Sequence, residues 1–443
     1  MTRTVVVGGG LAGITAALEL AAAGESVTLL EARSRLGGAT FSIERDGLWV
    51  DNGQHVFLRC CTAYRDLLER LAATEQTTLQ RRLAIPVLRP GGRVDWLRRT
   101  GLPAPFHLGV SIARFGPLPP RDRLRLLTAI RALQRLSLED PALDDVTFGD
   151  WLAQHGQRER ALSALWDLIA LPTLNLSAKD ASLALAAVVF KTGLLEDPGA
   201  ADVGWAKVPL QQVHGDAATR ALAGAGVQVH LGARVGAIAG TTVAWDGGAI
   251  DASTVVLAVP HDAAADLLPA GALPSGTEPR RLGVSPIVNL HLVYDRPVLR
   301  HPFAAAVDSP VQWVFDRTAG SGLRDGGQYL AVSLSGADAY TESTVDELRA
   351  RFVEALGELL PEAGPAEIVS FFVTREPRAT FRGVPGTAAH RPGPATNVPG
   401  LYLAGAWTDT GWPATMEGAV RSGLAAARAA LGGEHRTRER GAA

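Results

Sequence analysis

The feature that most constrains the fold lies at the N-terminus, where a glycine-rich turn joins a strand to a helix. Thr4–Val7 is a β-branched run typical of a buried strand, and the turn Gly8–Gly13 follows it directly. Leu11–Ala23 is rich in Ala and Leu and predicts a helix, and Ser26–Leu30 predicts a second strand. A strand, glycine turn, helix and strand within about 30 residues form the βαβ unit of a dinucleotide-binding fold.

The spacing of the glycines gives this turn a chemical meaning. Gly8 permits a tight turn, Gly10 lets the backbone approach a pyrophosphate, and Gly13 lets the helix pack closely on the strand. The helix N-terminus offers unpaired N–H groups to the phosphate charge. Glu31 ends the second strand, where its carboxylate can accept hydrogen bonds from the ribose hydroxyls of an adenosine. A purely structural glycine turn is the alternative, and the strand–turn–helix context with the acid in place disfavours it.

Composition limits the classes of function. The chain has 443 residues, which suggests two consecutive or interleaved domains, and its 47% hydrophobic and 20% charged content is that of a globular protein. Its net charge of −2 lacks the basic excess of a nucleic-acid-binding protein, so we expect no nucleic acid partner. The oligomeric state is not readable from the sequence.

The two cysteines and the apolar runs bear on location. Cys60 and Cys61 are adjacent, so they neither bridge readily nor form a metal site, and we expect a reduced, cytoplasmic setting without a metal. The N-terminus does not resemble a secretory leader. The longest uncharged apolar run, Ala181–Phe190, is too short for a bilayer span, which needs roughly 20 residues.

The remaining pattern divides the chain. Residues from about 60 to 200 predict helices joined by Pro-rich connectors, and the tail Gly432–Ala443 predicts disorder. We expect a helix over Met416–Leu431. Further strands are expected at Val227–Leu231, Val235–Ile238, Thr242–Trp245, Thr254–Val259, Ile287–Tyr294, Tyr329–Leu334 and Leu401–Ala404.

Beyond Glu31 the sequence continues through Ala32 and Arg33 to a second glycine pair, Gly37-Gly38. Here it resembles the FAD-dependent amine oxidase and carotenoid desaturase superfamily, which has an acid, a basic residue and then two glycines. The resemblance implies that this pair also brings backbone close to the phosphates of FAD. It therefore favours FAD over NAD as the cofactor.

Two further blocks extend the resemblance. Trp49-Val-Asp-Asn-Gly-Gln-His55 matches the segment that runs along the flavin in that superfamily, although Asp51 and His55 are equally typical of structural loop residues. The block Leu401–Gly423 matches the C-terminal FAD signature, where a helix N-terminus stabilises charge on the reduced ring. The cofactor-binding residues implied are Gly8, Gly10, Leu11, Ala12, Gly13, Glu31, Ala32, Arg33, Gly37, Gly38, Ala39, Gly53, Gln54, His55, Val235, Gly405, Thr415, Met416 and Ala419.

The fold class that follows is α/β, with a Rossmann-like FAD-binding domain of the amine oxidase type interleaved with a substrate domain of mixed sheet and helices. The expected FAD-binding segments are residues 1–60, 206–262 and 396–432. The expected substrate-domain segments are residues 61–205 and 263–395. The first of these is expected to be helical and to contain any membrane-facing region. Residues 433–443 form the tail.

Two positions depart from the superfamily pattern. Ala39 stands where an arginine usually follows the glycine pair, and Ala406 stands where an acid usually follows Ala404-Gly405. Both positions normally contact the phosphates or the ribityl chain. Backbone N–H groups are expected to replace the first contact, and Asp409 to replace the second.

The resemblance is closer to one family. Val50–Tyr64, Leu171–Asn175 and Trp407–Glu417 resemble hydroxysqualene dehydroxylases, over nearly the whole chain. The resemblance implies reductive removal of the allylic hydroxyl of hydroxysqualene to give squalene, with hydride from reduced flavin, in bacterial squalene and hopanoid synthesis. An acid must help water leave, and the candidates, of which none is preferred, are His55, Asp409 and Glu417.

Other functions stay open. A carotenoid or phytoene desaturase would use the same fold oxidatively, and an amine oxidase often carries a lysine near the flavin. The chain has only Lys179, Lys191 and Lys207, none in Ile287–Tyr294, where we expect that lysine. A flavin-poor scaffold of an isoprenoid complex is the non-enzymatic alternative.

The Arg-rich segment Arg121–Leu136 predicts an amphipathic helix in which Leu126, Leu127, Ile130 and Leu133 share a face. It either packs on its own domain or rests on an anionic membrane holding a long-chain isoprenoid. The preceding stretch with Phe106, Leu108, Ile112 and Phe115 is either a tunnel mouth or a packed surface loop. Peripheral contact with the inner face of the cell membrane is therefore an expectation.

Overall fold

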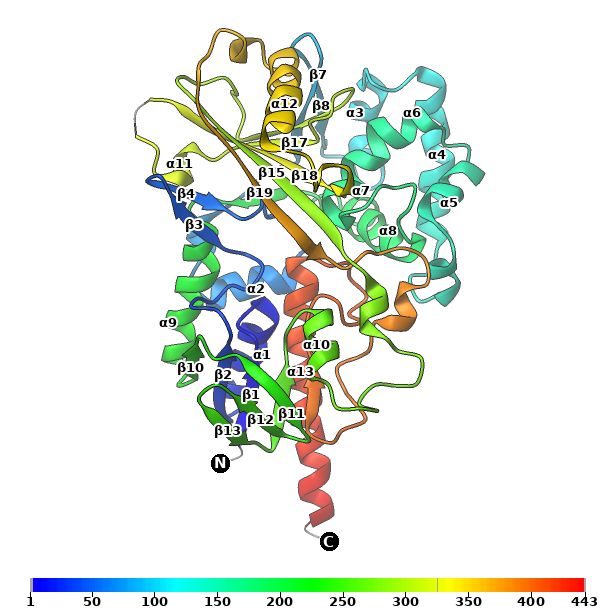
Figure 1. Ribbon diagram of the computed structural model, residues 1–443. Helices are drawn as coiled ribbons and strands as arrows, with labels where there is room; N and C mark the ends of the chain where they lie inside the picture. The colour runs from blue at the N-terminus through cyan, green and yellow to red at the C-terminus, as the bar shows by residue number, and fades with distance from the viewer. Residues whose placement is uncertain (1–2, 325, 442–443) are drawn as a thin grey trace.

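The computed structural model describes residues 3–324 and 326–441, and the side chains of residues 433–441 are outside that description. Figure 1 shows two layers along the long axis: a lower part with β1, β2, α1 and α13, and an upper part crossed by the long strands β15 and β19. Helices α3 to α8 form a lobe beside the upper part (Figure 1). Strands from distant segments build both parts.

The lower part is built on a parallel sheet of five strands. Its order is β10-β2-β1-β14-β20, and its strands come from three separated segments of the chain. Branched apolar side chains fill both faces of its middle strands, which is typical of a parallel sheet covered on both sides. The strands are β1 (Arg3–Val7), β2 (Ser26–Glu31), β10 (Gln228–Leu231), β14 (Thr254–Leu257) and β20 (Leu401–Leu403).

Helices and a small sheet surround this parallel sheet. The helices are α1 (Leu11–Ala22), α2 (Thr62–Arg70), α9 (Ala217–Gly224), α10 (His261–Leu267) and α13 (Met416–Gly441). The small antiparallel sheet consists of β11 (Val235–Ala239), β12 (Thr242–Trp245) and β13 (Gly248–Asp251). The interleaved α/β fold expected from the sequence is confirmed.

The upper part is a mixed sheet of seven strands in the order β19-β15-β18-β17-β16-β7-β8. One face packs against α12 (Val345–Leu359) through the alternate residues Val288, Leu290 and Leu292. The other face of β15 carries Asn289, which bonds to Asn52, and His291, which bonds to Tyr329 and Thr374 within the sheet. The strands are β7 (Ala84–Arg89), β8 (Arg93–Arg98), β15 (Ser285–Tyr294), β16 (Phe303–Ala306), β17 (Trp313–Asp316), β18 (Gln328–Ser335) and β19 (Ile368–Thr380).

Short strands connect the two parts: β3 (Ser42–Arg45) with β4 (Leu48–Asp51), and β5 (Val56–Leu58) and β6 (Thr77–Leu79) on either side of β9 (Val203–Ala206). The helical lobe contains α3 (Gly109–Arg114), α4 (Pro120–Arg135), α5 (Phe148–Gln154), α6 (Glu159–Ala161), α7 (Asp167–Leu174) and α8 (Leu183–Phe190), and α11 (Thr318–Ser321) follows β17.

The helical prediction for residues 60–200 is wrong for residues 77–98. β7 and β8 pair with each other and join the large sheet through β16. Pro86 concealed β7, because proline usually marks a connector, yet here it lies in a strand whose parallel pairing with β16 is limited to Val87 and Leu88.

The predicted disorder of the C-terminal tail is also wrong as far as Gly441. Helix α13 continues to that residue, and residues 442–443 lie outside the described part of the chain. Adding residues to an anchored helix requires no new nucleation, and Glu and Arg have high helix propensity. The polar composition of the tail therefore does not end the helix.

Helix α13 crosses α1 at a point where only glycine fits. A Cβ added to Gly423 would lie 2.3 Å from the carbonyl oxygen of Ala12 and 2.9 Å from Cβ of Thr15. By contrast, a Cβ on Gly432 of the same helix would meet no atom within 4 Å. This crossing holds the C-terminal segment against the glycine turn of the N-terminal βαβ unit.

We predict opposite effects for alanine at these two glycines. Gly432→Ala is expected to be neutral or to stabilise by up to about 1 kcal/mol, the helix propensity difference. Gly423→Ala is expected to destabilise by about 1–3 kcal/mol because it forces the two helices apart. Urea unfolding of both variants measures the difference, and equal effects would show that the close crossing is not a constraint.

Candidate functional site

The turn between β1 and α1 leaves backbone N–H groups available to an anion. Gly10 begins the helix, no side chain caps it, and its first turn carries no acidic residue. A Cβ on Gly10 would meet only Cα of Gly38, at 3.7 Å, whereas one on Gly13 would lie 1.9 Å from the carbonyl oxygen of Gly8. The N–H groups of Leu11–Gly13 thus lie in the first turn of α1, at a positive helix end, which suits a phosphate.

The second glycine pair packs directly on this turn. The N–H of Gly37 donates to the carbonyl oxygen of Gly9 over 2.9 Å. Gly38 has φ of 58°, and a Cβ there would lie 2.7 Å from Cα of Gly10. Ala39 is exposed, while the Arg35 guanidinium donates to the carbonyl oxygen of Gly38 over 3.2 Å. The two glycine turns therefore form one backbone-lined cradle.

Glu31 closes one end of the cradle. Its carboxylate is buried and accepts the N–H groups of Gly9, over 2.6 Å, and Arg33, over 2.7 Å. A carboxylate has about four acceptor positions, so two remain for hydroxyl donors. The N–H of Ala233 donates to the carbonyl oxygen of Glu31 over 2.8 Å, which brings the start of β11, with Val235, beside Ala32 and Arg33.

The C-terminal block lies against the same cradle. The N–H of Gly405 donates to Oγ of Ser422 over 2.8 Å, and the Thr415 hydroxyl accepts the N–H of Gly418 over 3.1 Å at the start of α13. Met416 and Ala419 pack on the cluster that also contains Leu11 and Ala12. The structure thus brings together three sequence blocks separated by hundreds of residues.

Two of the three candidate acids lie in structural hydrogen bonds. The buried carboxylate of Glu417 accepts the N–H groups of Ala63 and Tyr64 at the start of α2 and pairs with Arg421 over 2.7 Å. Asp409 is exposed and accepts the N–H of Gly411 over 3.1 Å. Ala406 is half-buried. It stands where an acid is usual, and Asp409 was expected to supply the contact of that missing acid.

Asp51 joins the two parts of the molecule through a buried ion pair. Oδ2 accepts Nη2 of Arg317 over 2.6 Å, with side-chain exposures of 5% and 11%. Oδ1 accepts the Ser42 hydroxyl over 2.6 Å and the N–H of Leu210 over 3.0 Å. Arg317 also donates to the carbonyl oxygen of Ala206 over 2.8 Å. The pair is therefore accompanied by further hydrogen bonds, which help to offset the cost of removing a buried ion pair from water.

Asn52 makes the matching connection on the other side of the strand. Its amide nitrogen donates to the carbonyl oxygen of Ala39 over 2.9 Å and to Glu376 over 3.2 Å, and its Oδ1 accepts the N–H of Phe41. Its carbonyl oxygen accepts Nδ2 of Asn289 over 2.9 Å. Burial raises the pKa of Glu376.

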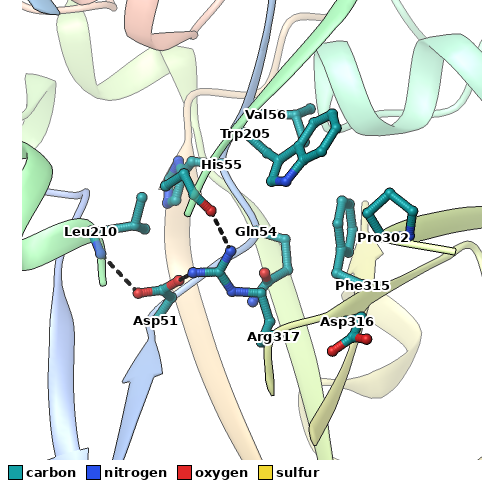
Figure 2. Close-up of a pocket in the computed structure, with 11 residues that line it drawn as sticks. Asp51, Gln54, His55, Val56, Trp205, Leu210, Pro302, Phe315, Asp316 and Arg317 are labelled. Carbon is teal, nitrogen blue, oxygen red and sulfur yellow. Dashed lines mark hydrogen bonds and ion pairs between the residues drawn. The ribbon is translucent and has the colours of Figure 1, made fainter. Parts of the chain in front are cut away.

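Beyond this joint the chain forms the wall of a small cavity. Figure 2 shows His55 on one side and the rings of Trp205 and Phe315 on the other, with Gln54 and Arg317 between them. Among the described residues, neither Nε2 of His55 nor Nε2 of Gln54, both buried, has a hydrogen-bond partner. The small cavity is thus lined by apolar and aromatic side chains together with the polar groups of Asp51, Gln54, His55, Asp316 and Arg317.

Sequence reasoning missed Arg317, Asn289, Glu376 and the buried His214. Nothing local marks them, because their partners lie in other segments of the chain. His214 accepts or donates at Nε2 with the Tyr64 hydroxyl, over 2.8 Å. In the described part of the chain, no group of three or more His, Cys, Asp or Glu side chains is placed to hold a metal ion.

The parallel sheet, the double glycine cradle and the acid at the end of β2 define a dinucleotide-binding oxidoreductase of the flavoprotein type. The chain belongs to the family of flavin containing amine oxidoreductases, whose model matches residues 11–431. It is a flavin oxidoreductase of the amine oxidase and carotenoid desaturase superfamily.

Relatives and solved structures show how far the similarity extends. The chain is 32% identical to a hydroxysqualene dehydroxylase of Rhodopseudomonas palustris over 96% of this chain and 98% of that one. It is 25% identical to a zeta-carotene desaturase of Synechocystis over 98% of both chains. A putrescine oxidase bound to putrescine shares the fold with a TM-score of 0.73 at 23% identity, covering 97% of this chain and 99% of that one.

We predict that the ion pair between the two parts contributes far more to the free energy of unfolding than a surface ion pair does. Asp51→Asn leaves the Arg317 charge buried alone and is expected to cost roughly 3–5 kcal/mol of unfolding free energy. The control is Asp308→Asn, whose carboxylate pairs with Arg160 at 37% and 35% exposure and is expected to cost below about 1 kcal/mol. Denaturant unfolding compares them, and a similar cost for both would contradict the role of the joint.

We predict that stability falls with acid because three histidines are buried in the neutral form. Burial lowers the pKa of His55 to about 4 and those of His214 and His291 to about 3. The unfolded chain protonates its histidines below about pH 6.5, so it binds more protons than the folded chain between that pH and pH 3–4. Stability is therefore fully present above this window and is lost as pH falls through it.

Replacing one of these histidines tests the prediction. His291→Gln is expected to reduce the slope of unfolding free energy against pH by up to about 1.4 kcal/mol per pH unit between pH 4 and 6. The exposed His230→Gln on β10 is expected to leave the slope unchanged. Identical slopes for both variants would mean that His291 titrates in the folded protein as it does in the unfolded chain.

Proposed function

We propose that the chain is an FAD-dependent oxidoreductase that removes the hydroxyl of hydroxysqualene reductively and gives squalene, in bacterial hopanoid and squalene synthesis. The observation that carries this proposal is the group of apolar and aromatic side chains in the wall of the cavity beside Gln54 and His55. Val56, Trp205 and Phe315 line it and belong to one packed cluster with Phe303 and Trp313. Such side chains suit contact with a hydrocarbon by their chemistry, and full-length similarity to hydroxysqualene dehydroxylases supports the choice of substrate.

The cradle fits FAD by the chemistry of its donors. Backbone N–H groups of Leu11–Gly13 would hold the pyrophosphate, Glu31 the adenosine ribose, and Val235 the adenine edge. Arg35, which lies at Gly38, provides a positive charge near the position where Ala39 lacks one. When bound, reduced FAD supplies the hydride that replaces the hydroxyl.

The protein itself must supply a proton, so that the hydroxyl leaves as water, and must exclude bulk water from the allylic cation. Of the three candidate acids, His55 lines the cavity, whereas Glu417 caps α2 and Asp409 is exposed. Burial keeps the His55 ring neutral, because its pKa is lowered to about 4. We assign His55 and Gln54 the role of N–H donors that orient the hydroxyl, and leave the proton source with a group that titrates nearer neutral pH.

The alternatives differ in the direction of electron flow and in the site. Carotenoid desaturation would use the same apolar walls with oxidised flavin, and relatives with 15-cis-phytoene desaturase names are about 25% identical. An amine oxidase often carries a lysine near the flavin, and β15, where we expect that lysine, contains none of the three lysines of the chain. A flavin-poor scaffold would purify without flavin absorbance.

Anaerobic turnover distinguishes these functions. Purified, photoreduced protein incubated with hydroxysqualene is expected to form squalene in a single turnover while flavin absorbance near the oxidised maximum returns. Protein incubated without substrate serves as the control for reoxidation by residual oxygen. Reduction of the oxidised flavin by phytoene or by an amine, with no squalene formed, would refute the proposed function.

A further inference from the structure

One surface of the helical lobe exposes an unusual number of large apolar side chains. Leu102, Phe106 and Val110 are 49%, 65% and 44% exposed, and Leu124 and Leu127 on α4 are 70% and 48% exposed. We call these five residues the lobe surface. The five lie within residues 102–127, and the other exposed large apolar side chains among the described residues lie outside that range: Ile43, Val94, Leu138, Leu231, Val345 and Val369. Gathered exposed apolar groups mark interaction surfaces.

The segments that carry the lobe surface are firmly held. The Ser111 hydroxyl accepts the N–H of Arg98 and donates to its carbonyl oxygen, which fixes α3 to the end of β8. Helix α4 contacts α3, and Arg123 donates to the carbonyl oxygens of Ala113 and Leu118. In Figure 1 both helices lie in the cyan lobe. The exposed side chains are thus presented by packed helices.

Helix α4 has two apolar faces, and only one is needed for the core. Leu126 and Leu133 are fully buried against the lobe. The face expected from the sequence therefore divides: Leu126 and Leu133 pack inside, whereas Leu127 points outward with Leu124. A helix that exposes a second apolar strip loses hydrophobic stabilisation unless a partner covers that strip.

The positive charge of the arginines near the lobe surface favours an anionic partner. Residues 96–136 contain eight arginines and one acid, the buried Asp122, in a chain whose net charge is −2. Arg99 is paired with Asp202 and Arg125 with Asp122. The exposed arginines are Arg98, Arg114, Arg121, Arg131 and Arg135. The Arg98 guanidinium also lies over the Trp96 ring. Exposed apolar side chains and exposed arginines on the same segments match an anionic lipid surface, with headgroups for the arginines and acyl chains for the apolar residues.

The lobe surface also adjoins the interior path to the cavity. Leu108, between Phe106 and Val110, packs against the apolar cluster of Leu83, Ala201, Val203, Phe303 and Phe315. Val56 and Trp205, which line the cavity, pack against that same cluster. The segment that carries Phe106 and Val110 and the wall of the cavity therefore contact one shared apolar cluster.

We propose that the lobe surface docks on an anionic phospholipid bilayer, and that a long-chain isoprenoid passes from the bilayer along this apolar cluster. Passage of the isoprenoid rests on the proposed function, whereas docking on the bilayer does not. Among the described residues, no helix combines the length and apolar character needed to cross a bilayer, so the contact would be at the interface.

Vesicle flotation of the flavin-loaded full chain tests the docking without any substrate. The protein is expected to float with vesicles of phosphatidylcholine and phosphatidylglycerol and to bind pure phosphatidylcholine more weakly. Phe106→Ser with Leu124→Ser is expected to weaken partitioning by at least about 10-fold for each side chain removed. Arg121→Gln with Arg131→Gln is expected to weaken binding to anionic vesicles by about fivefold per arginine.

The matched control is Val369→Ser on β19, which removes an apolar side chain of 64% exposure from a different surface. It is expected to bind vesicles as the unchanged protein does. Absence of vesicle binding, or equal binding by the Phe106/Leu124 variant, would overturn the proposal. Conversion of a dimer to a monomer by that variant, seen in sedimentation without lipid, would also overturn it and assign the surface to self-association.

Because flotation needs no turnover, it can succeed where the squalene assay fails, and the reverse. Retained flavin absorbance and an unchanged unfolding midpoint show that each variant is folded. These readouts separate failure of the docking surface from failure of the proposed function.

Discussion

The structure depends on one buried joint between its two parts, the ion pair of Asp51 with Arg317. Removing two charges from water is unfavourable unless every remaining hydrogen-bonding position is satisfied, and here Ser42, Leu210 and Ala206 supply the other partners. The next residue, Asn52, follows the end of β4 and connects the glycine cradle to β15 and β19. Two consecutive residues thus hold the junction through different partners.

The Asp51–Arg317 joint positions the segment that is expected to contact the flavin. Gly53, Gln54 and His55 follow it directly, so the segment expected to run along the flavin begins at the most firmly held point between the two parts. The cradle on one side is made of backbone, and the cavity on the other side is walled by aromatic rings. A rigid junction would keep a bound cofactor and a substrate in register, which a pair of independently moving domains would not do.

The sequence was informative where its signal is local. The βαβ unit, its glycines and Glu31 could be predicted because they lie within one continuous segment, and the short apolar strands followed from their composition. It could not show that Arg317 pairs with Asp51, 266 residues away, or that Glu417 caps a helix 353 residues earlier at Tyr64. Pro86 hid a strand, and the polar tail hid the continuation of α13. In each case a tertiary partner or an existing helix outweighed the local preference.

A crystal structure of the flavin-loaded protein soaked with squalene tests most directly whether residues 51–56 separate a flavin cradle from an apolar substrate cavity. We predict electron density for flavin along the two glycine turns, and for hydrocarbon between Val56, Trp205 and Phe315, with Gln54 and His55 facing the reacting end. Hydrocarbon density elsewhere, with the cavity beside His55 closed or filled by ordered water, would contradict the account.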